Sequence, residues 1–371
     1  ASGVRAPATT WMSLRAPSQS PARVRDTLSA AADILARLSD LPAVADREAP
    51  VRDAIRSELP DWARKQVVQD SAGDLILAMG PDRETTVFLA HMDEVGYTVR
   101  SIDASGMVTL TPDGGFNGAA WEGQPALLLL DTPRDAGSIS KPPASIAGVF
   151  VPREQARLRR PDTMRAWFGM DSSALVARGV HAGLAVTAFK RGERLAATRF
   201  TARALDDRAG DTALLLALAG IDRAKLNHKV IFVWSVEEEV GLFGAAAVAS
   251  HIGTSVHHAY AIDTFVSSDT PLESPTFALA PLGRGPVLRA SDDGMIVMPD
   301  ERARIISVAH NAGIRIQVGT TKGATDVDPF VTRGAIGAQL GWPGRYSHSP
   351  AEVLDLNDLE SLARLIQALA Q

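Results

Sequence analysis

The segment Val87-Phe88-Leu89-Ala90-His91-Met92-Asp93 decides the fold class of this chain. Its first four residues form a short, continuous apolar run, which is typical of a β-strand buried on both faces. Two later runs, 230–234 and 259–262, have the same character, and a helical pattern over 209–221 precedes them. Strands that alternate with helices predict an α/β fold, with a mainly parallel sheet covered by helices on both faces.

Further periodic segments extend this pattern towards both ends of the chain. Ser20-Pro21 resembles a helix start, because a capping residue is followed by proline in the first turn. The remaining segments predict a helix over 51–59, strands over 66–68, 75–78, 314–318 and 335–340, and a final helix over 359–369.

The stretch from residue 103 to residue 198 has a different pattern. A turn signal at Asp113-Gly114-Gly115 is followed by short strand-like runs at 126–130, 147–151 and 184–189. Closely spaced short strands with few helical patterns predict a small β-rich module. We therefore expect an inserted β-rich domain over 103–198. The catalytic α/β domain would comprise 1–102, whose first 20 residues form an extended arm, and 199–371.

Composition narrows the class of protein. The chain has 371 residues, enough for two domains, with 46% hydrophobic and 22% charged residues. Its net charge of −5 argues against a nucleic-acid partner, which would need excess Lys and Arg. No apolar run is long enough to span a bilayer, so we expect no membrane partner. The absence of cysteine leaves no thiolate for a metal site.

The first 20 residues bear on the compartment. The chain starts at Ala1, and residues 1–20 are rich in Ala, Ser, Thr and Pro. Cleavage of a signal peptide leaves an N-terminus of this kind, and so does trimming of the chain. We expect a periplasmic or secreted protein, with a cytoplasmic one as the alternative.

Acidic residues and histidines follow the ends of the apolar runs. His91 comes directly after the first run, Glu238 and Glu239 follow the second, and Asp263 follows the third. In an open parallel sheet, ligands bind beyond the carboxyl ends of the strands. Taken singly, each residue is more often the first solvated position of a loop. Together they predict one shared crevice.

Three more residues fit this crevice. Asp206 precedes the helical pattern that begins at Ala209, His348 follows the strand-like run 335–340, and Asp93 lies two residues after His91. Two imidazoles and several carboxylates form the mixed nitrogen and oxygen set that borderline divalent metals prefer. The sequence therefore predicts a metal-dependent hydrolase.

These motifs resemble those of the M42 family of metallo-aminopeptidases, which are co-catalytic two-zinc exopeptidases. The likeness runs from about Leu41 to the C-terminus, and the stretch 103–198 lies where that family carries its small β domain. The matching segments are Ala90-His91-Met92-Asp93-Glu94-Val95-Gly96, Leu205-Asp206-Asp207-Arg208, Glu238-Glu239-Val240-Gly241-Leu242, Ala261-Ile262-Asp263, Thr325-Asp326 and Arg345-Tyr346-Ser347-His348-Ser349.

The resemblance implies two divalent metal ions, with zinc expected and cobalt or manganese as alternatives. Asp206 would bridge the two ions. His91 and Asp263 would complete the ligands of one ion, and Glu239 and His348 those of the other. The expected partners are peptide substrates and, because relatives form large assemblies, further copies of the chain.

The resemblance also implies two supporting roles. Asp93 would accept a hydrogen bond from the far nitrogen of His91 and fix the tautomer of that imidazole. Glu238 would be the general base that takes a proton from the attacking water. The expected enzyme is an aminopeptidase that removes N-terminal residues from peptides.

Three other functions stay open on the sequence. A related di-metal amidohydrolase, such as a deacylase or a carboxypeptidase, would use the same ligands with another pocket. A glycosidase needs two carboxyl groups about 5–10 Å apart across a cleft, which the adjacent Glu238 and Glu239 rarely achieve. It would also leave His91 and His348 without roles. A non-catalytic binding protein would have no use for the base.

Overall fold

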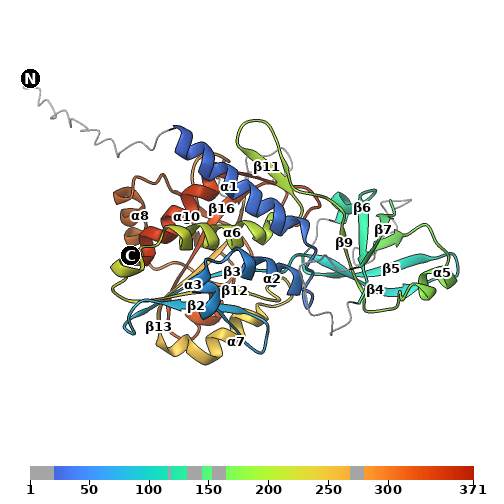
Figure 1. Cartoon of the computed structure of the whole chain (residues 1–371), viewed down its shortest axis with the longest axis horizontal. Helices are drawn as coiled ribbons and strands as arrows, with labels where there is room; N and C mark the ends of the chain where they lie inside the picture. The colour runs from blue at the N-terminus through green and yellow to red at the C-terminus, as the bar shows by residue number, and fades with distance from the viewer. Residues whose placement is uncertain (1–20, 116–117, 132–143, 153–163, 268–279) are drawn as a thin grey trace, which may run out of the picture.

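The chain folds into an α/β domain with a smaller β-barrel beside it (Figure 1). This computed structural model describes residues 21–115, 118–131, 144–152, 164–267 and 280–371. Within those ranges, no helix combines the length and the apolar character that crossing a membrane requires. The extended arm expected for residues 1–20 lies outside the described residues.

An eight-stranded mixed sheet forms the centre of the α/β domain. In spatial order its strands are β1 (Val68–Gln69), β2 (Leu75–Met79), β12 (Lys229–Ser235), β3 (Thr85–His91), β13 (Val256–Val266), β16 (Ile336–Gly344), β14 (Val287–Ser291) and β15 (Gln317–Thr320). The central strands β12, β3, β13 and β16 are parallel to one another. The predicted sheet, parallel at its centre, is therefore confirmed.

The central strands form because both of their faces are buried. All seven residues of β3 are buried, which explains the unbroken apolar run in the sequence. On one face the ring of Phe88 packs against Phe232 and Tyr260, with centroids 5.6 and 5.2 Å apart. On the other face Val87 and Leu89 join a separate apolar cluster. Burial of each such side chain contributes about 1.5–3 kcal/mol.

Helices cover both faces of this sheet (Figure 1). The helices are α1 (Pro21–Asp40), α2 (Ala49–Glu58), α3 (Asp61–Gln66), α6 (Leu205–Gly220), α7 (Phe243–Ile252), α8 (Pro299–Asn311), α9 (Asp328–Val331) and α10 (Leu356–Ala370). α1, α6 and α10 pack together on the face that bears Phe88, whereas α7 and α9 cover the opposite face. The strand predicted over 66–68 is wrong at its start, because Gln66 ends α3.

The inserted module is a closed barrel of six strands. Its strands are β4 (Gly96–Ile102), β5 (Met107–Asp113), β8 (Met164–Trp167), β7 (Ser145–Phe150), β6 (Pro125–Leu129) and β9 (Ala185–Ala188), with the short helices α4 (Gly118–Trp121) and α5 (Ser172–Ala177). Aliphatic and aromatic side chains fill its interior, where Tyr97, Trp121 and Phe150 contact one another.

The boundaries expected for this module, 103 and 198, both lie too late in the chain. β4 pairs with β5 and with β9, so the barrel cannot close without residues 96–102. At the other end, β10 (Glu193–Arg194) and β11 (Arg199–Ala202) leave the barrel. They form a three-stranded sheet with β17 (Glu352–Asp355).

Glu94, just beyond β3, connects the two domains. Its buried carboxylate accepts hydrogen bonds from the guanidinium of Arg203, from the backbone N–H of Ala43 at 2.8 Å, and from Thr187 of β9 at 3.1 Å. Burial alone would raise the pKa of Glu94, but Arg203 and Arg208 hold it below its ordinary value. One carboxylate thus joins the α/β domain, the barrel and the segment that follows α1.

We expect Glu94→Gln to lower the free energy of unfolding by about 3–5 kcal/mol, because it leaves a buried guanidinium without its counter-charge. Urea denaturation of the metal-stripped protein measures the change. Glu58→Gln is the matched control, since it removes the surface ion pair with Arg37 and should cost less than about 1 kcal/mol. Equal losses in the two variants would contradict a connecting role for Glu94.

Candidate metal centre

The predicted side chains lie at the carboxyl ends of the central parallel strands. His91 is the last residue of β3, and Glu238 and Glu239 follow the end of β12. Asp263 lies within β13 rather than after it, because β13 continues its pairing with β16 as far as Val266. For the same reason β16 continues to Gly344, four residues before His348, and the strand predicted over 335–340 is too short.

Asp206 stands between the two imidazoles. His91 Nε2 lies 3.4 Å from Asp206 Oδ1, and His348 Nε2 lies 3.5 Å from Asp206 Oδ2. His348 Nε2 also lies 3.4 Å from Glu239 Oε2, and His91 Nε2 lies 3.9 Å from Glu238 Oε2. Each oxygen of one carboxylate therefore faces a different imidazole.

The potential ligand atoms form three overlapping groups, and within each group all of these atoms lie within 4.8 Å of one another. The groups are His91 with Glu238 and Glu239, His91 with Asp207 and Asp263, and Asp206 with Glu239 and His348. The structure thus brings together every ligand candidate named from the sequence. It also adds Asp207, which the sequence reasoning quoted in the Asp-Asp doublet without giving it a role.

Asp93 lies behind this cluster and holds its parts in place. Its Oδ1 lies 3.3 Å from His91 Nδ1, within ion-pair range but without hydrogen-bond alignment. The two oxygens of Asp93 accept the backbone N–H groups of Glu238 and Glu239, each at 3.0 Å. The same carboxylate therefore adjoins the imidazole and fixes the loop that carries both glutamates.

Glu352 is a residue that the sequence reasoning missed. It is 2% exposed, on β17, and accepts the backbone N–H of Asp206 at 2.9 Å and that of His348 at 2.8 Å. The contact with Asp206 spans 146 residues of sequence, so no local motif signals it. Glu352 fixes the backbone of two ligand candidates at once.

Asp207 is completely buried at the start of α6. Its Oδ1 accepts hydrogen bonds from Trp342 Nε1 at 3.1 Å and from the backbone N–H of Gly210 at 2.9 Å. Its Oδ2 has no hydrogen-bond partner among the described residues. The Oε1 of Glu239 is likewise buried without one. Buried carboxylate oxygens without donors are costly, and a bound cation removes that cost.

The pKa shifts of the clustered side chains also favour a bound cation. Burial raises the pKa of Glu238 well above its ordinary value, that of Glu239 to about 7 and that of Asp263 to about 6. Burial alone would lower the pKa of His348, yet Glu239 and Asp206 raise it to about 10. These carboxylates are short of positive charge, and their donor chemistry suits divalent cations that accept both nitrogen and oxygen ligands.

A cavity of about 700 Å³ opens onto the cluster. Its lining includes Asp206, Glu238, Glu239, Asp263 and His348. Gly115 from the barrel and the basic residues Arg289 and Lys322 complete parts of its wall. The volume lies in the range of small-ligand sites.

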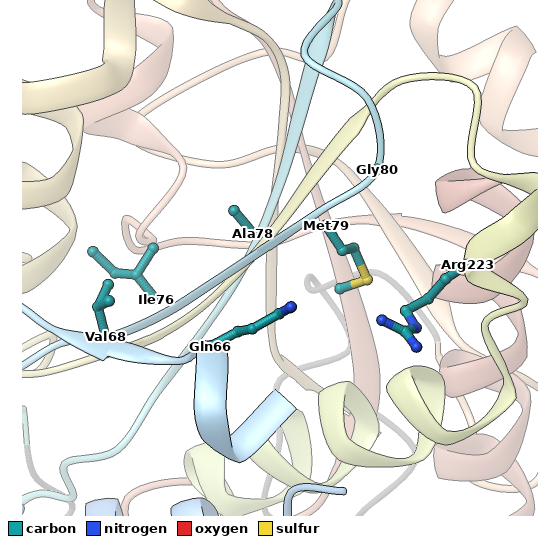
Figure 2. Close-up of a pocket in the computed structure, with 7 residues that line it drawn as sticks. All are labelled: Gln66, Val68, Ile76, Ala78, Met79, Gly80 and Arg223. Atoms are coloured by element: carbon teal, nitrogen blue, oxygen red, sulfur yellow. The ribbon is translucent and has the colours of Figure 1, made fainter. Parts of the chain in front are cut away.

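Another cavity, of about 620 Å³, lies at the β1–β2 edge of the sheet (Figure 2). Its lining consists of Gln66, Val68, Ile76, Ala78, Met79, Gly80 and Arg223. The guanidinium of Arg223 stacks on the ring of Trp62 at 3.9 Å. This lining offers neither a carboxylate nor an imidazole, so it has none of the groups that the chemistry requires.

Comparison with known proteins assigns the family. A model of the M42 glutamyl aminopeptidase family matches residues 73–365. The chain belongs to the M42 glutamyl aminopeptidase family. This M42 protein is 29% identical to SgcX of Escherichia coli strain K12, over 88% of this chain and 90% of that one. It is 25% identical to the glutamyl aminopeptidase of Lactococcus lactis subsp. cremoris, over 91% and 95% of the two chains.

The fold of this M42 protein has a solved counterpart. The TET1 peptidase of Pyrococcus horikoshii superposes with a TM-score of 0.80 at 30% sequence identity, over 92% of this chain and 99% of that one. The predicted family and fold are therefore confirmed. The protein is a hydrolase, a metallopeptidase of the aminopeptidase class.

Proposed function

We propose that the protein is a two-metal aminopeptidase in which Glu238 is the general base. The observation that carries the proposal is the placement of Asp206 between the imidazoles of His91 and His348, with Glu238 and Glu239 beside them. A carboxylate that faces two nitrogen ligands is suited to bridge two cations.

The ligands divide naturally between two ions. His91 and Asp263 would hold one together with Asp206, and Glu239 and His348 would hold the other. The distances support this division. Ligand atoms of His91 and Asp263 lie within 4.8 Å of one another, as do those of Asp206, Glu239 and His348. Zinc suits this ligand set, and cobalt and manganese are the alternatives.

Glu238 has the position and the environment of a proton carrier. When bound, the two ions polarise the scissile carbonyl and make a proton of water easier to remove. Glu238 takes that proton as the water oxygen attacks the carbonyl carbon. It then gives the proton to the leaving amine as the carbon–nitrogen bond breaks. Burial raises the pKa of Glu238, and cations bound beside it would favour the ionised carboxylate that accepts the proton.

The excess of carboxylates also favours the free end of a peptide. The five carboxylates of Asp93, Asp206, Glu238, Glu239 and Asp263 exceed the four positive charges of two divalent ions by one. In the cavity wall, Arg289 is paired with Asp292 and Lys322 is exposed to solvent, so the centre favours an N-terminal ammonium group. An acylated amine carries no such charge, which is why we favour an aminopeptidase over a deacylase.

A panel of aminoacyl anilides and their N-acylated counterparts tests this proposal. We expect hydrolysis of the free-amine substrates alone, complete loss of activity in a chelator, and recovery when Zn²⁺, Co²⁺ or Mn²⁺ is returned. Activity restricted to the acylated substrates would select the amidohydrolase alternative. Undiminished activity in the chelator would reject metal catalysis altogether.

We also propose that the protein forms a homo-oligomer. The TET1 peptidase of Pyrococcus horikoshii, which shares this fold, is described as able to assemble into a tetrahedron or a large octahedral shell. The superposition covers 99% of the TET1 chain, so this protein has a counterpart of each domain of the TET1 peptidase.

A further inference from the structure

Trp121, a residue of the inserted barrel, contacts the backbone of the candidate metal centre. Its indole Nε1–H donates a hydrogen bond to the carbonyl oxygen of His348 at 3.0 Å, across 227 residues of sequence. Trp121 is the last residue of α4 and is 2% exposed. The donor is therefore buried, and the hydrogen bond as a whole is partly shielded from water, which strengthens it.

The barrel interior fixes the direction of this donor. The ring of Trp121 packs edge to face on Tyr97, with centroids 5.4 Å apart, and on Phe150, with centroids 5.3 Å apart. Such pairs contribute about 0.5–1.5 kcal/mol each and hold the ring in one orientation. Packing within the barrel, and not within the α/β domain, therefore sets the direction in which the N–H group points.

His348 needs such support because of its backbone conformation. Its φ of +59° lies in the left-handed region, which costs an L residue of order 1 kcal/mol and persists only where the surroundings hold it. Its N–H donates to Glu352 and its C=O accepts from Trp121, so each domain holds one side of the residue.

A second barrel residue limits the imidazole itself. A Cβ atom built on Gly115, just beyond β5, would lie 3.3 Å from His348 Nδ1. The backbone of the barrel therefore passes close to the ring on the side away from Asp206, which faces Nε2. The barrel thus contacts His348 both at the carbonyl group and at the imidazole.

We propose that Trp121 is a positioning residue through which the barrel sets the orientation of His348, and so the affinity for the ion that His348 holds. This inference rests on the proposed two-ion site. Without the indole donor, the carbonyl loses its partner and the peptide on the C-terminal side of His348 can rotate. The imidazole then leaves its alignment with Asp206 and Glu239.

Zinc titration of chelator-stripped Trp121→Phe against a chromophoric chelator tests the inference. The unmodified protein should bind two ions. In the variant we expect one ion to bind as before and the other to bind about tenfold or more weakly, the usual cost of losing a group that orients a ligand. Two unchanged affinities would overturn the inference, and so would equal weakening of both, which indicates general damage.

Trp167→Phe is the matched control, because Trp167 is an exposed indole on β8 of the same barrel and should leave both affinities unchanged. If Trp121→Phe fails to fold, replacement of Trp121 by benzothienylalanine keeps the shape and removes only the N–H. The same two outcomes then decide. If the unmodified protein binds no zinc, the two-ion site fails, whereas two ions with unchanged affinities in the variant remove the role of Trp121 alone.

Discussion

Glu238→Gln should keep two metal ions and lose about 10²–10⁴-fold in turnover, the range that a general base contributes. The amide has nearly the shape of the carboxylate but cannot accept a proton from water. Steady-state kinetics on an aminoacyl anilide measures the loss, and metal analysis of the same sample measures occupancy. Because the base acts only in the transition state, kcat and kcat/KM should fall together.

Glu237→Gln is the control for that variant. It makes the same chemical change one residue earlier, at a side chain that belongs to none of the ligand groups in the described part of the chain. We expect turnover close to that of the unmodified enzyme. Near-normal turnover in Glu238→Gln would refute its role as base, and loss of metal would show that Glu238 is a ligand instead.

Much of the fold could be predicted because buried strands and helices have recognisable apolar patterns in the local sequence. The run at 87–90 is apolar throughout, since β3 is covered on both faces. α6 is rich in Ala and Leu for the same reason, because it is buried on nearly all sides. The boundary at 102 failed because β4 is mostly buried at its start and exposed towards its end, so its sequence has no unbroken apolar run like that of β3. Its membership of the barrel depends on pairing with β9, more than 80 residues later.

In the site, too, residues within local motifs could be predicted, whereas residues defined by contacts with distant parts of the chain could not. His91, Asp206 and His348 stand in motifs that can be recognised in sequence, and the fold brings them together. Glu352 contacts the backbone of Asp206 across 146 residues of sequence, and Trp121 contacts that of His348 across 227. A lone acid and a lone tryptophan carry no spacing signal, so only the fold shows what they contact.

Asp206→Ala should lose both metal ions and all measurable activity. Each oxygen of Asp206 faces a different imidazole, so the substitution removes a ligand from both proposed sites at once. The charge balance changes as well. Burial alone would raise the pKa of Asp206, but His348 and His91 hold it well below its ordinary value. The carboxylate is thus ionised and contributes its charge to cation binding.

Elemental analysis after dialysis against zinc measures the expected fall from two ions per chain to none. Thermal unfolding gives an independent measure, because a ligand present at 100 times its Kd stabilises a protein by about 2.7 kcal/mol. That zinc-dependent stabilisation should vanish in Asp206→Ala and persist in Asp82→Ala, which removes an exposed carboxylate paired with Lys229. Two ions retained by Asp206→Ala would show that no carboxylate bridge joins the two halves of the site, and the ligands would then have to be divided into two separate sites.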